Sequence, residues 1–125
     1  MISILAVPLI EWAQGNDDPN TLRARNKHAM RYVAAGQPVK AIPLYKQTLA
    51  DCRRMFGTSD PSTLRARNNL AMCYLAAGQT AEAIPLLKRT LADSKRLLGA
   101  NHPDTKAVRA NLASLTGSLA AAGSH

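Results

Sequence analysis

Aromatic side chains are scarce in this chain, with one Trp, one Phe and three Tyr among 125 residues. Strands favour aromatic and β-branched residues, so this shortage argues against a sheet. Alanine and leucine make up most of the apolar share, and both suit closely packed helices. The composition therefore predicts an all-α fold, in a chain long enough for one domain with a continuous core.

Cysteine and histidine are also few. The two cysteines, Cys52 and Cys73, lack the paired spacing of a zinc or redox site. We expect both to be reduced packing residues of a cytoplasmic protein, with a disulfide between them as the alternative. The three histidines, His28, His102 and His125, have no ligand spacing to Cys, Asp or Glu, so we expect no metal site.

The motifs of catalysis are missing as well. The sequence contains no phosphate-binding loop and no nucleophile placed beside a base. Asp51 recurs as Asp93, but Arg54 and Arg96 follow them at the spacing of an ion pair on one helix. We therefore expect no enzymatic activity and no cofactor.

Long apolar runs are absent too. Residues 1–10 are largely apolar, but the run is only about ten residues long and no Lys or Arg precedes it. This segment fits neither a signal peptide nor a membrane-spanning helix. We expect a soluble, cytoplasmic protein that does not contact a membrane.

Acidic residues are half as frequent as basic ones, with 8 Asp and Glu against 16 Lys and Arg and a net charge of +8. Such a chain attracts acidic partners. One alternative is nucleic acid, but aromatic stacking residues are few and no nucleic-acid reader motif is present, so we do not expect it. The basic residues that prompt this alternative are Arg53, Arg54, Lys88, Arg89, Lys95 and Arg96.

What the sequence does contain is a regular series of glycines. Five of its seven glycines stand 21 residues apart without insertion or deletion: Gly15, Gly36, Gly57, Gly78 and Gly99. Glycine just past a helix end accepts the left-handed conformation that other residues resist. The series therefore predicts a row of equal helices joined by short turns.

Side chains repeat at twice that interval. Residues 18–59 align with residues 60–101 without gaps, and roughly 26 of 42 positions are identical. Each repeat therefore contains two helices, and a stack of such antiparallel pairs can share one core.

The helix boundaries follow from caps and prolines. Asp18 can accept from free amides of the first turn, with Pro19 where a missing amide costs nothing. Pro43 and Pro85 lie just past the first turn of the second helices and predict a mild bend. The expected helices run from residue 18 to 35, 38 to 56, 61 to 77, 80 to 98 and 103 to 122. The expected units are a half repeat (1–15), two repeats (18–57 and 60–99) and a capping helix (102–123).

Small, aromatic and glycine positions together carry a family resemblance. The segment from Asn69 to Gln79, with Ala71, Tyr74 and Gly78, resembles a tetratricopeptide repeat, and Ala83-Ile-Pro-Leu follows it. The 42-residue length and the His102-Pro-Asp-Thr opening are similar to the kinesin-light-chain variant. This resemblance implies a short right-handed α-solenoid that acts as a protein-interaction module.

The resemblance also implies a concave face lined by the first helix of each unit. Polar groups there would hold a peptide or a partner helix, and arginine would favour acidic side chains. The implied binding residues are Arg23, Asn26, Lys27, Met30, Arg65, Asn68, Asn69, Met72, Asn111 and Ser114.

Some repeated polar residues also fit structural roles. The asparagines could instead form hydrogen bonds between units, and Arg23, Lys27 and Arg65 could be a solvated helix face. Arg25, Arg67 and Arg109 recur three times, which favours a structural role with stems packed between helices. We expect His28 at the edge of the core, because it aligns with leucines, and His102 as a helix cap.

The beginning of the chain predicts a further contact. Gly15 would close a second helix whose partnering first helix is missing. Such an apolar half repeat needs cover from a longer parent chain, a partner or a second copy, as in a homodimer. The residues that would form this self-association surface are Leu5, Leu9, Ile10 and Trp12.

Overall fold

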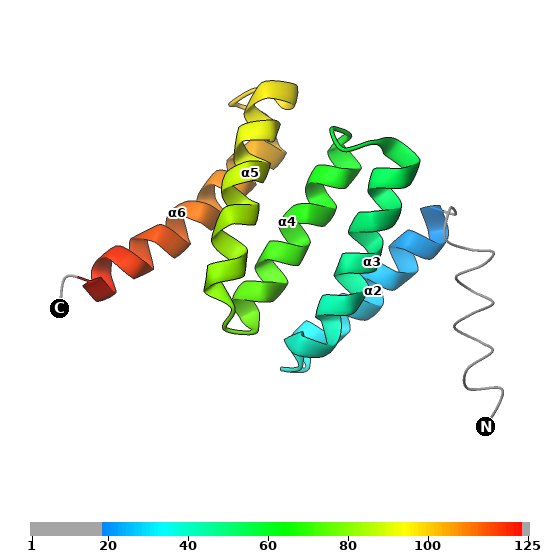
Figure 1. Cartoon of the computed structure of the whole chain (residues 1–125), viewed down its shortest axis with the longest axis horizontal. Coiled ribbons are helices and arrows are strands. Elements are labelled where there is room, and N and C mark those ends of the chain that lie inside the picture. The colour runs from blue at the N-terminus through cyan, green and yellow to red at the C-terminus, as the bar shows by residue number, and fades with distance from the viewer. Residues whose placement is uncertain (1–18, 124–125) are drawn as a thin grey trace.

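The computed structural model describes residues 19–123, with side chains described for residues 21–115. Within that part the chain forms five helices and no strand, with each helix packed against the next (Figure 1). The all-α stack of antiparallel helix pairs is thereby confirmed. The helices are α2 (Pro19–Ala34), α3 (Pro38–Phe56), α4 (Pro61–Ala76), α5 (Thr80–Leu98) and α6 (Pro103–Gly123).

The helix boundaries agree with the sequence prediction to within one residue. Asp60 caps α4, because its carboxylate accepts from the backbone N–H of Ser62 at 2.9 Å, and Pro61 occupies the first turn. His102 caps α6 as predicted, with its Nδ1 accepting from the N–H of Asp104 at 3.1 Å. Asp18 and the half repeat over residues 1–15 lie outside the described residues.

The four glycines that follow α2, α3, α4 and α5 have positive φ, but they are of two kinds. Gly36 ends α2 in a Schellman motif, with the N–H of Gln37 donating to the carbonyl of Tyr32 at 2.8 Å. Gly57 instead has φ 88° and ψ 166°, a region that essentially only glycine occupies. The sequence predicted a left-handed cap at both glycines. This prediction is wrong for Gly57, whose ψ is nearly extended.

Alanine allows the two helices of each repeat to approach closely. Ala29 and Ala41 face each other's helices in the first repeat and are fully buried, as are Ala71 and Ala83 in the second. A larger side chain at these places would hold the backbones apart. Two apolar clusters result, one around α2, α3 and α4 and the other around α4, α5 and α6.

The thrice-repeated arginines are structural, as predicted. The Arg25 guanidinium lies 2.7 Å from the carboxylate of Asp51, and Arg67 lies 2.8 Å from Asp93. Each pair joins the first helix of a repeat to its second helix, with the arginine side chain 4% or less exposed. Arg109 donates to the carbonyl of Ala100 at 3.1 Å.

The structure corrects the prediction for His28. Its side chain is exposed and stacks on Tyr32, with ring centroids 5.0 Å apart and planes inclined by 17°. It aligns with Leu70, which is buried beneath α3 and α5, whereas no described helix precedes α2 to cover His28. Alignment with a core position therefore did not bury this histidine.

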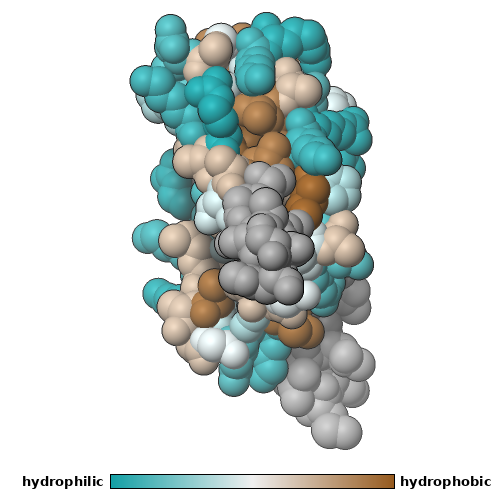
Figure 2. Space-filling view, turned by 90° about the vertical axis from the view of Figure 1, so that its left-hand side faces the viewer, coloured by the Kyte–Doolittle hydropathy of each residue, from teal (hydrophilic) through white to brown (hydrophobic). Residues whose placement is uncertain are grey.

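Hydrophobic side chains reach the surface at the α6 end of the stack. Figure 2 shows them as a band between hydrophilic side chains on this end of the molecule. Ile84, Leu91 and Leu112 of the second cluster are only partly buried. Among the described residues, no helix is long and apolar enough to cross a membrane.

A candidate binding groove on the first helices

The helices α2, α4 and α6 form one side of the stack, which we call the first-helix face. Three hollows of about 310, 170 and 150 Å³ lie along it, the first two between α2 and α4 and the third between α4 and α6. Side chains of the second helices, such as Thr48 and Ser94, form part of the hollow linings. Seven of the ten predicted binding residues line these hollows: Arg23, Asn26, Met30, Arg65, Asn68, Asn69 and Met72.

Asparagine pairs connect successive repeats across this face. Asn69 Nδ2 donates to Asn26 Oδ1 at 3.4 Å, and Asn111 Nδ2 donates to Asn68 Oδ1 at 3.1 Å. Both pairs are separated by 43 residues, so they are the same contact made twice. Hydrogen bonds between units, which the sequence left open, are therefore present.

These pairs do not use all the polar groups of the asparagines. A side-chain amide has two N–H donors and a carbonyl oxygen with two acceptor sites. Among the described residues, Asn68 Nδ2 and Asn111 Oδ1 have no hydrogen-bond partner, and Asn26 Nδ2 has only the Met30 sulfur at 3.6 Å. Each pair thus keeps amide groups available for a further hydrogen bond.

The two arginines of the first-helix face differ in their surroundings. Arg65 Nε donates to Asp104 Oδ2 at 2.9 Å, which joins α4 to α6 and neutralises part of its charge. Arg23 has no carboxylate partner among the described side chains. Among the described side chains, Arg23 is therefore the more available of these two arginines for a carboxylate of a ligand.

Methionines supply the apolar part of the face. Met30 is 54% exposed and shares its hollow with Met72, Val33 and Tyr45. A flexible thioether side chain adapts to differently shaped apolar groups. The hollow, of about 170 Å³, has room for an apolar side chain of a ligand.

Three predicted residues do not line the hollows. Lys27 and Ser114 are exposed, and Asn111 reaches this face only by donating a hydrogen bond to Asn68, which lines a hollow.

The sequence analysis missed Asp104 as a residue of this face. The sequence did contain a sign of it, because Asp104 stands 42 residues after Ser62, so an acid replaces a serine at the equivalent repeat position.

Titratable groups near the face have shifted pKa values. Burial raises the pKa of the Cys73 thiol, and burial with nearby Asp51 raises that of Cys52. Both cysteines are free and buried, and Cys73 Sγ lies 3.2 Å from the carbonyl oxygen of Pro38. The hydrogen bond from Arg67 lowers the pKa of Asp93.

No cluster of three or more His, Cys, Asp or Glu side chains suited to a metal ion occurs in the described part of the chain. The arrangement on the first-helix face offers amide, guanidinium and thioether groups. Such groups bind by hydrogen bonding and packing.

Comparison with known proteins identifies the repeat. The tetratricopeptide repeat family matches residues 21–93 and 62–120. No curated protein sequence matches the chain.

Two similar solved structures contain the nearly identical TPR-like repeats assigned to a kinesin light chain of Podosopora anserina. The first has a TM-score of 0.75 and 31% identity over 83% of this chain. The second, a variant of that protein with one residue exchanged, has a TM-score of 0.74 and 31% identity over 82% of this chain. The chain spans about half the length of these structures, 49% and 48% respectively.

Proposed function

The chain belongs to the tetratricopeptide repeat family, and on that premise we propose that it binds a peptide or helix of a partner protein on its first-helix face. In this proposal it is a non-catalytic interaction module. Its buried free thiols favour a reducing compartment, so we place it in the cytoplasm.

The observation that supports this proposal best is the pair of asparagine contacts. Each places unpaired amide donors and acceptors between two first helices. A peptide backbone presents the complementary N–H and carbonyl groups at regular intervals. Hydrogen bonds to the backbone would hold a partner segment, while the Met30 hollow would accept one of its apolar side chains.

Charge favours an acidic partner at one end of this face. Arg23 is exposed and has no described carboxylate partner, so it can pair with a side-chain or terminal carboxylate. Asp104 opposes a second carboxylate near Arg65. The preferred segment would therefore carry its acid near α2.

The test is a selection of randomised displayed peptides on the full chain, followed by affinity measurements on variants. Asn68→Asp keeps an oxygen that accepts from Asn111 but removes the free amide donor of Asn68. We expect about a fivefold or greater loss of peptide affinity, since one hydrogen bond contributes about 1 kcal/mol and the new carboxylate repels the peptide carbonyl that the amide had bound.

The matched control is Asn101→Asp, which makes the same chemical change at an exposed turn residue that lines none of the three hollows. Urea unfolding of both variants checks that the fold is retained. Unchanged affinity in a folded Asn68→Asp variant would exclude the assignment of this face.

The nucleic-acid alternative rests on the net charge of +8. Two of the residues that prompted it, Arg54 and Arg96, form ion pairs with Asp51 and Asp93. Filter binding across a salt series separates the two ideas, because phosphate contacts lose affinity steeply as salt rises. We expect weak retention without sequence preference.

The self-association alternative rests on Leu5, Leu9, Ile10 and Trp12, which lie outside the described residues. Light scattering with and without residues 1–15 tests it. A monomer in both cases would remove this alternative.

A further inference from the structure

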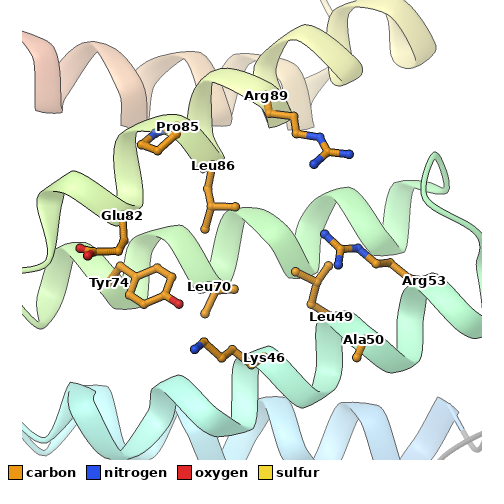
Figure 3. A pocket seen from close by; sticks show the side chains of 10 residues that line it. All are labelled: Lys46, Leu49, Ala50, Arg53, Leu70, Tyr74, Glu82, Pro85, Leu86 and Arg89. Carbon is orange, nitrogen blue, oxygen red and sulfur yellow. The ribbon is translucent and has the colours of Figure 1, made fainter.

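A second groove lies on the opposite side of the molecule, between the second helices α3 and α5 (Figure 3). Its hollow measures about 570 Å³ and is larger than each of the three on the first-helix face. Side chains of α3 and α5 form its walls, and α4 supplies part of its floor. We call it the second-helix groove, lined by Lys46, Leu49, Ala50, Arg53, Leu70, Tyr74, Glu82, Pro85, Leu86 and Arg89.

The floor of this groove is apolar. Leu49 from α3 and Leu70 from α4 are each 5% exposed, and the half-buried Leu86 projects from α5 toward them. A leucine or phenylalanine side chain placed here would meet hydrocarbon from three helices. Burial of such a side chain is favourable because its apolar surface leaves water.

The rim of the groove is basic. Arg53 on α3 and Arg89 on α5 both extend into the space between the two helices, and Lys46 Nζ lies 6.0 Å from the centre of the Tyr74 ring. None of these three cations has a carboxylate partner among the described side chains. The other two arginines of α3 and α5, Arg54 and Arg96, are paired with Asp51 and Asp93, so the two second-helix arginines without a described carboxylate partner are those that line the groove.

The groove contains a single acid, Glu82, which lies near Tyr74 at the opposite end from Arg53 and Arg89. The potential along the groove is therefore uneven. A ligand with carboxylates beside Arg53 and Arg89 would be attracted at that end and would avoid Glu82.

We propose that the second-helix groove is a docking site for an acidic segment of a partner protein, with a large apolar side chain on the leucine floor. Carboxylates next to that side chain pair with Arg53 and Arg89. This site is separate from the first-helix face and does not depend on the function proposed for that face.

The apolar floor favours a protein segment over nucleic acid. Phosphate groups would pair with the three cations but would leave Leu49, Leu70 and Leu86 without a partner. Base stacking needs open aromatic faces, and the groove has only the Tyr74 ring, which Lys46 approaches. An acidic segment with an apolar side chain matches both parts of the groove.

The repeat supplies a matched control. The groove residues of α3 (Lys46, Leu49, Ala50 and Arg53) have equivalents on α5, each 42 residues later: Lys88, Leu91, Ala92 and Lys95. No described helix stands beside this second half groove as α5 stands beside α3. Lys88→Glu with Lys95→Glu therefore makes the same charge change as Arg53→Glu with Arg89→Glu, outside the complete groove.

The experiment uses randomised displayed peptides on the full chain, with each enriched peptide measured against both double variants. We expect one enriched class to carry a leucine, methionine or phenylalanine beside aspartates or glutamates. Arg53→Glu with Arg89→Glu should weaken this class by at least about tenfold. Lys88→Glu with Lys95→Glu and Asn68→Asp should leave its affinity nearly unchanged.

Several results would overturn the proposal. One is the absence of such an acidic class, and another is equal weakening by the two double variants, as general attraction to net charge predicts. Displacement of these peptides by a single-stranded oligonucleotide with higher affinity would assign the groove to nucleic acid. A dimer in analytical ultracentrifugation that Arg53→Glu with Arg89→Glu dissolves would assign it to a second copy.

Failure of the first-helix proposal would look different. Peptides sensitive to Asn68→Asp would be missing from the same selection, while peptides sensitive to the Arg53 and Arg89 changes would remain. The two sites are thus tested separately in one experiment.

Discussion

Asp51 is the point at which three polar side chains of the first repeat meet. It is 2% exposed, and its two carboxylate oxygens accept from Arg25, Arg54 and Gln47. The Arg25 side chain is 4% exposed, whereas that of Arg54 is 50% exposed. One carboxylate therefore forms a buried ion pair and a solvated one.

The difference in burial predicts unequal costs of substitution. Asp51→Ala leaves the buried Arg25 guanidinium without its carboxylate and should lower the free energy of unfolding by about 3–5 kcal/mol. Arg54→Ala breaks an exposed pair and should cost less than about 1 kcal/mol. Urea unfolding measures both.

If Asp51→Ala does not fold, Asp51→Asn takes its place in the comparison, because the amide oxygen still accepts a hydrogen bond. Similar losses for the Asp51 and Arg54 variants would contradict the assignment of a buried and an exposed pair.

Asp93, the equivalent of Asp51 in the second repeat, predicts that the stability of the fold depends on pH. The hydrogen bond from Arg67 holds the pKa of Asp93 below the usual value, although partial burial acts in the opposite direction. An acid with a lowered folded-state pKa contributes stability above its unfolded pKa of about 4, and this contribution is lost as pH falls through the folded value.

We therefore expect wild type to exceed Asp93→Asn in stability at neutral pH and the gap to narrow as pH falls below about 4. Urea midpoints measured across that range for both proteins give the gap. A gap that stays constant with pH would show that ionisation of Asp93 does not stabilise the fold.

At this scale the sequence predicted some roles well and missed others. The threefold return of Arg25, Arg67 and Arg109 predicted a structural role, because solvated positions need not repeat. The pairing of Asn26 with Asn69 could not be predicted, since these residues occupy different places in their repeats. Their contact depends on the offset between stacked helices, which the sequence pattern does not contain.

At the scale of helices, the glycines show that helices in this chain end in two different ways. The first helix of a repeat ends in a Schellman motif at Gly36, and the second ends at Gly57 with nearly extended ψ. Neither glycine has a neighbouring atom within 4 Å of an added Cβ, so backbone conformation and not space requires glycine.

Asparagine substitution should distinguish the two ends. Asparagine tolerates the left-handed region, so Gly36→Asn should cost less than about 1 kcal/mol. At Gly57 the required φ of 88° with ψ of 166° is strained for any side chain, and Gly57→Asn should cost about 1–3 kcal/mol. Thermal unfolding of the two variants side by side gives the comparison, and equal costs would contradict it.

Helix boundaries were predictable from sequence because caps, prolines and glycines mark them locally. The second-helix groove was not predicted, since its walls and floor come from three helices. Its residues have ordinary helical spacing within α3 and within α5, but the sequence pattern does not show that these two helix faces lie side by side. The bend expected at Pro43 and Pro85 remains a prediction, and both helices continue past these residues.

For the whole molecule, stability depends on neighbouring units because each helix packs mainly on the next. The second apolar cluster includes Val108 and Leu115 of α6, which cover the fully buried Leu87 of α5. The first cluster, around Ala29 and Tyr45, contains no residue of α6.

A chain ending at residue 102 should therefore lose stability unevenly. Val108 and Leu115 each contribute about 1.5–3 kcal/mol of burial, and their loss exposes Leu87. Amide hydrogen exchange should show α5 losing protection before α2 and α3. Equal loss of protection in α2 and α5 would contradict separate clusters.

The offset of one residue between the paired asparagines gives each unit a direction. In the unit from 60 to 101, Asn69 donates to the preceding unit and Asn68 accepts from the following one. The position equivalent to Asn69 in the first repeat is Lys27, and the position equivalent to Asn68 in α6 is Ala110. The asparagine contact therefore does not continue beyond these two pairs. A duplicated copy of residues 60–101 inserted in frame would therefore match both neighbours without any other substitution, so duplication of this segment can lengthen the protein in single steps.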